Sequence, residues 1–330
     1  MNTTEDVLLS RDKNNFNLLR FIAAVGVIIT HSYALLNFPE KDALTQVTNG
    51  LLSFSRLGVY VFFIISGFLV TNSLRNDSNL KSFFWKRFLR IFPALAVVLF
   101  LTVFIVGPFI STLSYKEYFA RPAVYHYLIG GLSLYDTQYS LPGVFKSNPR
   151  TGANGSLWTL SYEWTCYVLL ACLILPLKKY RIAGALVIIF VLMGLRLLVG
   201  RYQIFEVITF LKLDSRQLLL FGILFFSGAL GLGIRQYLKF RPVIFLLFVL
   251  LIFYLSYINK SVAFYFILFL TPYLVLSLAQ MRLSMKITKW FSTFDYSYGL
   301  YIYAYLVGQI LVNYFYKYLT VPYLILFTVL

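Results

Sequence analysis

Long apolar runs, separated by short polar stretches, dominate this 330-residue chain. Several runs approach the roughly 20 residues that an α-helix needs to cross a bilayer, and they are continuous rather than alternating. A backbone inside a membrane must satisfy its own hydrogen bonds, which favours helices. Because 60% of the residues are hydrophobic and only 12% are charged, we predict an all-α polytopic integral membrane protein. Residues 1–330 are expected to form a single membrane-embedded domain.

The apolar runs predict nine helices and the start of a tenth. The nine expected helices cover residues 15–37, 54–74, 88–110, 156–177, 182–200, 216–235, 242–258, 261–280 and 294–316. The tenth run begins near Tyr318, and about a dozen residues are too few to cross a bilayer of roughly 30 Å. We therefore expect about ten transmembrane helices, the last of them short or incomplete.

The basic residues indicate how the chain is oriented. The net charge is +17, but the lysines and arginines lie between apolar runs, so nucleic acid is rejected as a partner. Of these 29 residues, 17 fall in the N-terminal segment and in alternate short connections. The positive-inside rule places the N-terminus and those connections in the cytoplasm. The longest connection, residues 111–155, then lies outside, and its interspersed apolar residues predict that it packs as a cap.

The stretch "LRFIAAVGVIITH", residues 19–31, has a cation near one end and a proton-transfer group at the other. Arg20 and His31 are eleven residues apart, so they share a helix face and lie about 16 Å apart along the axis. A snorkelling arginine and an interfacial histidine are one explanation. The shared face favours a second one, a polar track through the bundle, because ionisable groups inside membranes usually mark function.

Two further segments carry charges that this track could use. Glu163, in "NGSLWTLSYEWTCY", is expected at a depth similar to that of His31, where it would orient the imidazole and stabilise its charged form. The alternative is a structural hydrogen bond. Arg87 and Arg90, in "FFWKRFLRIFP", share a face and predict phosphate binding. Ordinary positive-inside charge would explain either arginine alone.

The segment "DYSYGLYIYAY" opens the ninth expected helix. Asp295 either caps this helix or pairs with a cation. Tyr298, Tyr301 and Tyr305 form a stripe of hydroxyl groups, which ordinary helix packing would equally explain. His126 fits a plain loop histidine better than an acceptor-binding one. The chain has only two histidines and two cysteines, so we expect no metal site.

Together these segments resemble the acyltransferase-3 family, polytopic bacterial membrane enzymes that O-acylate carbohydrates. The matching stretches are "NNFNLLRFIAAVGVIITHSYALL", "GVYVFFIISGFLVTNSL", "FFWKRFLRIFPAL", "LPGVFKSNPRTGANGSLWTLSYEWTCY" and "DYSYGLYIYAY". They spread over residues 14–305, so the likeness covers nearly the whole chain. One departure is "YAYLVGQ", where the family motif often continues into a proline.

The resemblance implies a membrane O-acetyltransferase of the bacterial inner (plasma) membrane. Its donor would be cytoplasmic acyl-CoA, commonly acetyl-CoA, with no permanently bound cofactor. Its acceptor would be a hydroxyl of a cell-envelope carbohydrate or glycolipid, such as lipopolysaccharide or another polysaccharide. Arg20 and His31 match the family's Arg/His pair, Arg87 and Arg90 its donor-binding pair, and Glu163 its acidic position. Five further residues are expected to bind substrate: Asn154, Trp158, Asp295, Tyr298 and Tyr301.

We hypothesise that Arg20, Arg87 and Arg90 hold the CoA phosphates while His31, oriented by Glu163, removes the acceptor proton. A covalent acyl-enzyme formed on a tyrosine or serine remains open. The competing class is a proton-coupled transporter or flippase for a glycan or lipid intermediate, although the chain shows no internal repeat. A non-catalytic scaffold ranks third. The sequence indicates neither the acyl group, nor the particular glycan, nor the oligomeric state.

Overall fold

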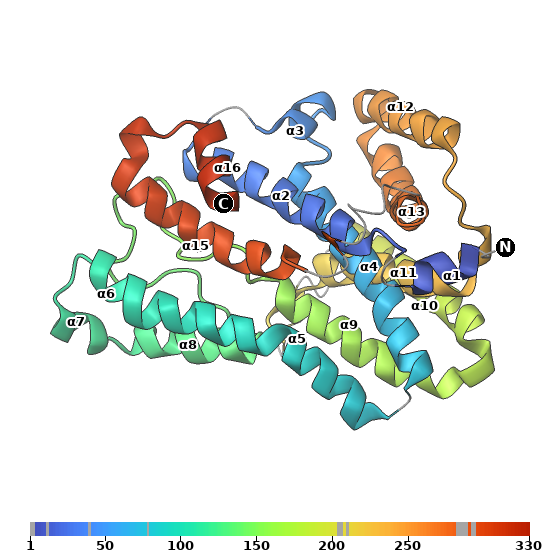
Figure 1. The fold of residues 1–330 in the computed structure, drawn as a ribbon, viewed down its shortest axis with the longest axis horizontal. Coiled ribbons are helices and arrows are strands. Elements are labelled where there is room, and N and C mark those ends of the chain that lie inside the picture. Colours follow the sequence, from blue (N-terminus) through green and yellow to red (C-terminus); the bar gives the residue numbers. More distant parts are fainter. Residues whose placement is uncertain are drawn as a thin grey trace.

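The fold is a bundle of helices packed around α4 (Phe54–Asn76), which contacts α2, α9, α11 and α13 (Figure 1). It is described from a computed structural model. The structure describes residues 4–10, 13–38, 41–77, 79–202, 207–208, 211–281, 290–291 and 295–330. Both α4 and α11 bury most of their side chains. The all-α prediction is therefore confirmed for the described part of the chain, apart from one two-residue strand pair.

The element bounds are as follows. The α-helices are α1 (Thr4–Leu9), α2 (Phe16–Leu35), α3 (Ala43–Val47), α4 (Phe54–Asn76), α5 (Leu80–Phe100), α6 (Gly107–Ile110), α7 (Tyr115–Phe119), α8 (Pro122–Ser133), α9 (Thr159–Leu173), α10 (Arg181–Tyr202), α11 (Ser215–Gly233), α12 (Pro242–Ile258), α13 (Lys260–Leu278), α15 (Ser297–Phe315) and α16 (Val321–Val329). The other elements are the π-helix η1 (Leu101–Val106), the 3₁₀ segments η2 (Leu175–Tyr180), η3 (Arg235–Tyr237) and η4 (Tyr316–Tyr318), and the antiparallel strands β1 (Val207–Ile208) and β2 (Leu213–Asp214).

Six of the described helical segments are long and apolar enough to cross a membrane. They are α2, α4, α5 continued through η1 and α6, α10, α11 and α13. The apolar α12 is shorter, with 17 residues, and α9 has 15 residues. The expected tenth run forms α16, a nine-residue helix that packs against α2 and α15. The composition of these helices therefore identifies the chain as a membrane protein. The described residues give six candidate spans, against the expected count of about ten.

Small residues let α4 lie close to its neighbours. A Cβ atom added to Gly67 would come within 1.8 Å of the Phe225 carbonyl oxygen on α11. One added to Gly228 would come within 2.1 Å of the Ile64 oxygen. Backbones approach this closely only where no side chain intervenes, as is usual between helices in membranes. These contacts fix the rotation of α4 and hence the side chains that it presents to the other helices.

The connection 111–155 packs against the bundle, as its apolar residues predicted. The side chains of Tyr118 and Tyr127 are buried, and the Tyr118 hydroxyl donates to the Val103 carbonyl at 3.0 Å. That carbonyl lies in η1, where the wider turn changes the regular hydrogen bonding of the helix. Further along, the Asn148 amide donates to the Gln309 side chain on α15 at 2.7 Å. The connection is thus held both to the long α5 segment and to α15.

An exposed charge cluster in the connection 111–155 joins α8 to the residue before β2. The Asp136 carboxylate contacts Lys212 and His126, each at 2.6 Å. Hydrogen bonds from Lys212 and then His126 hold the pKa of Asp136 at about 2, below its usual value. His126 therefore has a local partner on the surface, and it lies on α8 rather than in a loop.

The close approach of α4 and α11 gives the first testable prediction. Gly67→Ala should lower the thermal midpoint of the detergent-purified protein, because the helices must separate at a cost of about 1–3 kcal/mol. Gly194→Ala on α10 is the matched control, since a Cβ atom there meets nothing within 4 Å. Its midpoint should stay the same or rise slightly. Equal losses in both variants would contradict this account of the packing.

Candidate active site

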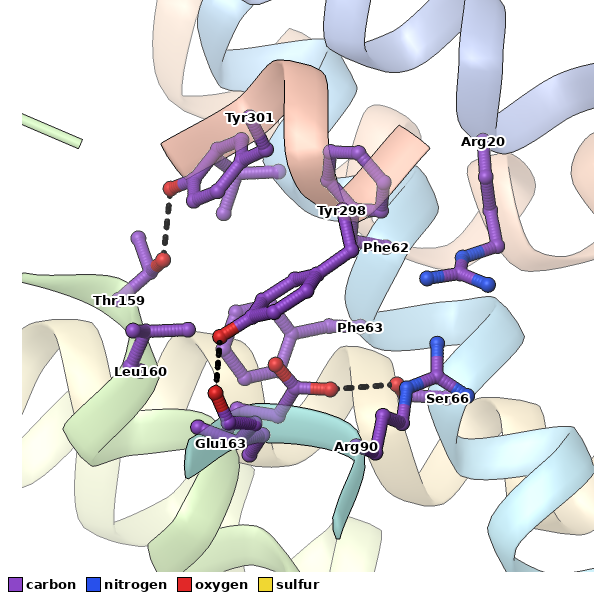
Figure 2. A pocket seen from close by; sticks show the side chains of 12 residues that line it. Arg20, Phe62, Phe63, Ser66, Arg90, Thr159, Leu160, Glu163, Tyr298 and Tyr301 are labelled. Carbon is purple, nitrogen blue, oxygen red and sulfur yellow. Dashed lines mark hydrogen bonds between the residues drawn. The ribbon is translucent and has the colours of Figure 1, made fainter. Parts of the chain in front are cut away.

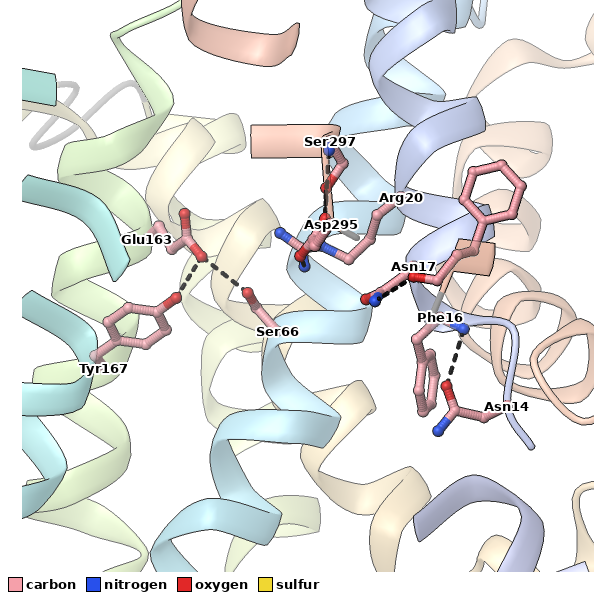
Figure 3. A network of polar contacts seen from close by, with 10 residues as sticks. Asn14, Phe16, Asn17, Arg20, Ser66, Glu163, Tyr167, Asp295 and Ser297 are labelled. Carbon is pink, nitrogen blue, oxygen red and sulfur yellow. Dashed lines mark hydrogen bonds and ion pairs between the residues drawn. The ribbon is translucent and has the colours of Figure 1, made fainter. Parts of the chain in front are cut away.

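Arg20 lies inside the bundle, where its side chain is 6% exposed. It forms an ion pair with Asp295, which precedes α15 (Figure 3). The Asp295 carboxylate also accepts hydrogen bonds from the hydroxyl of Ser297 at 2.5 Å and from its backbone N–H at 3.3 Å. The pairing of Asp295 with a cation is therefore realised. The N-cap of α15 is instead Tyr296, which makes no side-chain cap hydrogen bond, and Asp295 contacts the first helical residue, Ser297. The pair joins the N-terminal helix to the C-terminal part of the chain.

Glu163 lies across the bundle on α9. Its carboxylate accepts hydrogen bonds from the Ser66 hydroxyl on α4, at 2.8 Å, and from the Tyr167 hydroxyl one turn along α9 (Figure 3). These donors stabilise an acidic side chain that is only partly exposed to solvent. They also fix the direction of the carboxylate toward α4.

Arg20, Arg90 and Glu163 line one small cavity, together with Tyr298 and Tyr301 of α15. We call it the inner pocket. Its volume is about 30 Å³, and Figure 2 shows these side chains turned toward the same space. The Tyr298 hydroxyl donates to the Ile91 carbonyl at 2.9 Å. Two arginines therefore share one membrane-depth pocket with a carboxylate.

Arg87 does not line the inner pocket. Its guanidinium donates to the Ser73 hydroxyl at 3.2 Å and lies over the rings of Phe83 and Tyr167, at 5.6 and 5.9 Å from their centroids. Arg87 and Arg90 are three residues apart, so their directions around the helix axis differ by about 60°. With this offset, only Arg90 lines the inner pocket. The expected pair is therefore divided, with Arg90 inside the pocket and Arg87 packed on aromatic rings beside α4.

His31 lies in a different part of the interior. Its ring meets that of Tyr305 edge-on, with 5.1 Å between the centroids. It lines a cavity of about 10 Å³ with Tyr305 and Tyr301, and a larger one of about 430 Å³ with Trp158, Arg56 and others. We call the larger one the outer cavity. Within the described residues, no hydrogen bond joins His31 to Glu163, and the two line different cavities.

Tyr301 connects these regions. It is the one residue that lines the inner pocket, the small His31 cavity and the outer cavity, among the cavities described above. Its hydroxyl shares a 2.6 Å hydrogen bond with Thr159, and its ring meets Phe62 edge-on at 5.4 Å (Figure 2). The side chain therefore forms a wall between the arginine side and the histidine side. The predicted tyrosine stripe faces this track, since Tyr298 and Tyr305 line the cavities on either side.

The two remaining predicted residues have different surroundings. Asn154 is fully buried, and its amide donates to the Ile302 carbonyl at 2.7 Å while its oxygen accepts from the Ser156 N–H at 3.0 Å. These bonds give Asn154 a structural position between the long connection and α15. Trp158 lines the outer cavity and packs edge-on against Tyr162. Of Asn154 and Trp158, only Trp158 lines one of the cavities described above.

A family model described as "Acyltransferase domain" matches residues 13–330. The chain belongs to the acyltransferase-3 family. It is an acyltransferase, and the match includes every residue that lines the inner pocket. No solved structure gives a significant match to the enzyme.

Three characterised proteins resemble this acyltransferase. An "O-acetyl transferase" of Shigella phage Sf6 is 29% identical over 303 residues, which cover 91% of this chain and 86% of the relative. "Nodulation protein 10" of Rhizobium leguminosarum bv. viciae is 37% identical over 56% of this chain and 50% of its own length. "Acyltransferase MdmB" of Streptomyces mycarofaciens is 31% identical over 46% of this chain and 36% of its own length.

Sequence reasoning did not single out three residues that bind members of the candidate site. Ser66 and Tyr167 bind Glu163, and Thr159 binds Tyr301. Each lies in or beside a segment that was already conspicuous, "FFIISGF" or "LWTLSYEWTCY". Tyr167 could have been found from its i+4 spacing to Glu163, since residues four apart on a helix are neighbours. Ser66 had no such signal, because its contact depends on how α4 packs against α9.

The buried ion pair gives a prediction about stability. Asp295→Asn should lower the free energy of unfolding by about 2 kcal/mol, because it leaves the Arg20 charge without its partner. This is below the roughly 3–5 kcal/mol for a fully buried pair, since the Asp295 side chain is 29% exposed. Asp77→Asn is the control, because the Asp77–Lys86 pair is exposed, and it should lower the stability much less than Asp295→Asn. Thermal unfolding in detergent measures both, and similar losses would rule out this role for the Arg20 pair.

Proposed function

We propose that this acyltransferase moves an acetyl group from cytoplasmic acetyl-CoA to a hydroxyl of a cell-surface or lipid-linked carbohydrate. Family membership supports acyl transfer. The phage relative is named an O-acetyl transferase, which supports O-acetyl transfer in particular. The acetyl-CoA donor and the carbohydrate acceptor are part of the proposal, and no nucleic acid or bound metal takes part in it.

The proposed orientation follows from the distribution of charge. With its basic connections in the cytoplasm, the N-terminus is cytoplasmic, and the protein spans the bacterial inner membrane. In this arrangement the six long helices are joined by α15, which has 19 residues, and by the shorter apolar helices α9, α12 and α16, which makes about ten membrane-embedded segments. Arg20 then lies toward the cytoplasm and His31 toward the outer face.

The observation that carries the proposal is the meeting of three cavities at Tyr301. On one side, Arg20 and Arg90 offer guanidinium groups that suit phosphate oxygens. On the other side, His31 offers an imidazole nitrogen that can accept the proton of a hydroxyl group. A long linear donor, with phosphates at one end and a thioester at the other, fits this order of chemical groups.

Side chains that line the inner pocket must move before the donor can enter it. The inner pocket holds only about 30 Å³, which is room for about one water molecule. The thin pantetheine arm of CoA would pass toward His31 when Tyr301 turns away from Thr159. The hydrogen bond between these two hydroxyl groups is therefore the contact that donor binding breaks.

His31 is proposed as the general base. The imidazole takes the proton of the acceptor hydroxyl while the hydroxyl oxygen forms a bond to the thioester carbon. The carbon–sulfur bond then breaks, and CoA leaves as a thiolate that receives the proton from the imidazolium. Such general-base assistance typically contributes about 10²–10⁴-fold in rate. Direct transfer of this kind predicts that no acylated side chain accumulates.

Glu163 and Asp295 balance the arginine charges in this proposal. Two carboxylates near two guanidinium groups keep the buried site close to neutral, which lowers the cost of placing charges at membrane depth. Because Glu163 contacts Ser66 and Tyr167, we assign it to the positioning of the donor side. This role differs from the orientation of His31 that the sequence favoured, and that pairing stays a prediction.

The histidine assignment is tested through the acetyl ester on surface glycans. A deletion strain should lose alkali-labile acetyl ester, and the wild-type gene should restore it. His31→Ala at equal protein level should restore less than about 1% of it, given the usual contribution of a general base. His126→Ala is the matched control, because it removes the other histidine of the chain, and it should restore the ester fully. Restoration by His31→Ala would eliminate His31 as the base, and an unchanged ester in the deletion strain would contradict acetyl transfer to these glycans.

The donor assignment is tested by acetyl-CoA binding to purified protein. Arg90→Gln should raise the dissociation constant about tenfold or more, because it removes a charge-assisted hydrogen bond to phosphate. Arg87→Gln should raise it less than about threefold, since Arg87 points to Ser73 outside the inner pocket. Isothermal titration calorimetry measures both constants. Equal weakening would extend the donor site to Arg87, and no weakening by Arg90→Gln would refute the phosphate contact.

A further inference from the structure

A cavity lined by three arginines lies between α4, α10 and α11. It encloses about 310 Å³, and its charged lining residues are Arg75, Arg181 and Arg235. None of its lining residues is acidic. We call it the arginine cavity. Like charges that face one space repel each other unless an anion lies among them.

The arginine cavity is separate from the proposed active site. None of its lining residues lines the inner pocket, the small His31 cavity or the outer cavity. Arg75 follows Ser66 by nine residues, which at about 100° per residue puts them on opposite faces of α4. The cavity therefore faces α10 and α11, whereas Ser66 faces α9.

Buried polar atoms in the lining lack partners. Thr71 is 6% exposed, and its hydroxyl has no hydrogen-bond partner in the described part of the chain. The Nε of Arg181 is likewise buried without one. Burying such groups without hydrogen bonds is unfavourable. An anionic ligand with several oxygen atoms would supply acceptors for both.

The rest of the lining is apolar and opens toward a lipid-exposed helix. Ile182 contributes to the cavity wall and is itself 46% exposed. One and two turns further along α10, Leu186 and Phe190 are 40% and 75% exposed. Large apolar side chains with this exposure on a membrane helix are suited to acyl chains. A ligand with a charged head and a hydrocarbon tail fits this surface.

We propose that the arginine cavity binds the phosphate of an anionic phospholipid headgroup. The guanidinium groups of Arg75 and Arg181 contact the phosphate oxygens, and the Thr71 hydroxyl donates to one of them. The acyl chains lie along the exposed face of α10. Basic pockets between membrane helices recognise anionic headgroups in this way. The proposal does not depend on the reaction that the enzyme catalyses.

The test is native mass spectrometry of the full-length protein in detergent, titrated with phosphatidylglycerol or phosphatidylcholine. The wild type should bind phosphatidylglycerol about tenfold more tightly than the zwitterionic lipid. Arg181→Gln should remove most of this preference, and Arg181→Lys should keep part of it. Arg201→Gln, near the other end of α10, is the matched control and should bind like the wild type. Arg75→Gln replaces Arg181→Gln if the latter does not fold.

Three other outcomes overturn the lipid proposal. Equal phosphatidylglycerol binding by the wild type and Arg181→Gln would show that the cavity does not recognise the lipid. Full displacement of phosphatidylglycerol by millimolar inorganic phosphate would identify a site for free phosphate. If Arg181→Gln weakened acetyl-CoA binding as much as it weakened phosphatidylglycerol binding, the cavity would be assigned to the donor. Failure of acetyl-CoA to bind the wild type would count against the proposed function alone.

Discussion

The buried charge of Arg20 is the constraint on which the rest of the site depends. An arginine side chain that is 6% exposed in an apolar bundle must have an anionic partner, because an isolated charge there is very unfavourable. Asp295 supplies that partner from the opposite end of the sequence. The start of α15 is thereby held beside α2, and the tyrosines of α15 are placed over the inner pocket. One ion pair therefore determines where the tyrosine track begins.

The packing of α4 provides the second half of the site. Gly67 and Gly228 allow α4 and α11 to approach until backbone meets backbone, which leaves α4 almost no freedom to rotate. Ser66, next to Gly67, is consequently turned toward Glu163. The hydrogen bond that orients this carboxylate thus follows from helix packing on an adjacent face of α4. The same rotation directs Thr71 and Arg75 away from the active site and toward α10 and α11.

The sequence predicted much of the fold and the general chemistry of the site. The hydrophobic runs located the long helices because membrane-embedded backbone must be helical, and the observed α2 lies within the expected residues 15–37. Arg20 is buried within the helix that this apolar run predicted. Helix bounds were less accurate at polar ends. Asn79 caps α5 at Leu80, before the expected start at residue 88, since a helix continues beyond its apolar part when a cap is present.

By itself the sequence determined how far apart the residues of one helix lie along its axis, because the rise of a helix converts residue number into distance. It also brought out Arg20, His31 and Glu163 as a matched set. Tertiary structure decided which of them meet. Glu163 pairs with Ser66 and Tyr167, and Tyr301 lies where the arginine side and the histidine side come together. The physical reason is that the position of a residue along its helix axis leaves the rotation and the neighbours of that helix undetermined. Contacts between residues far apart in the chain fix both.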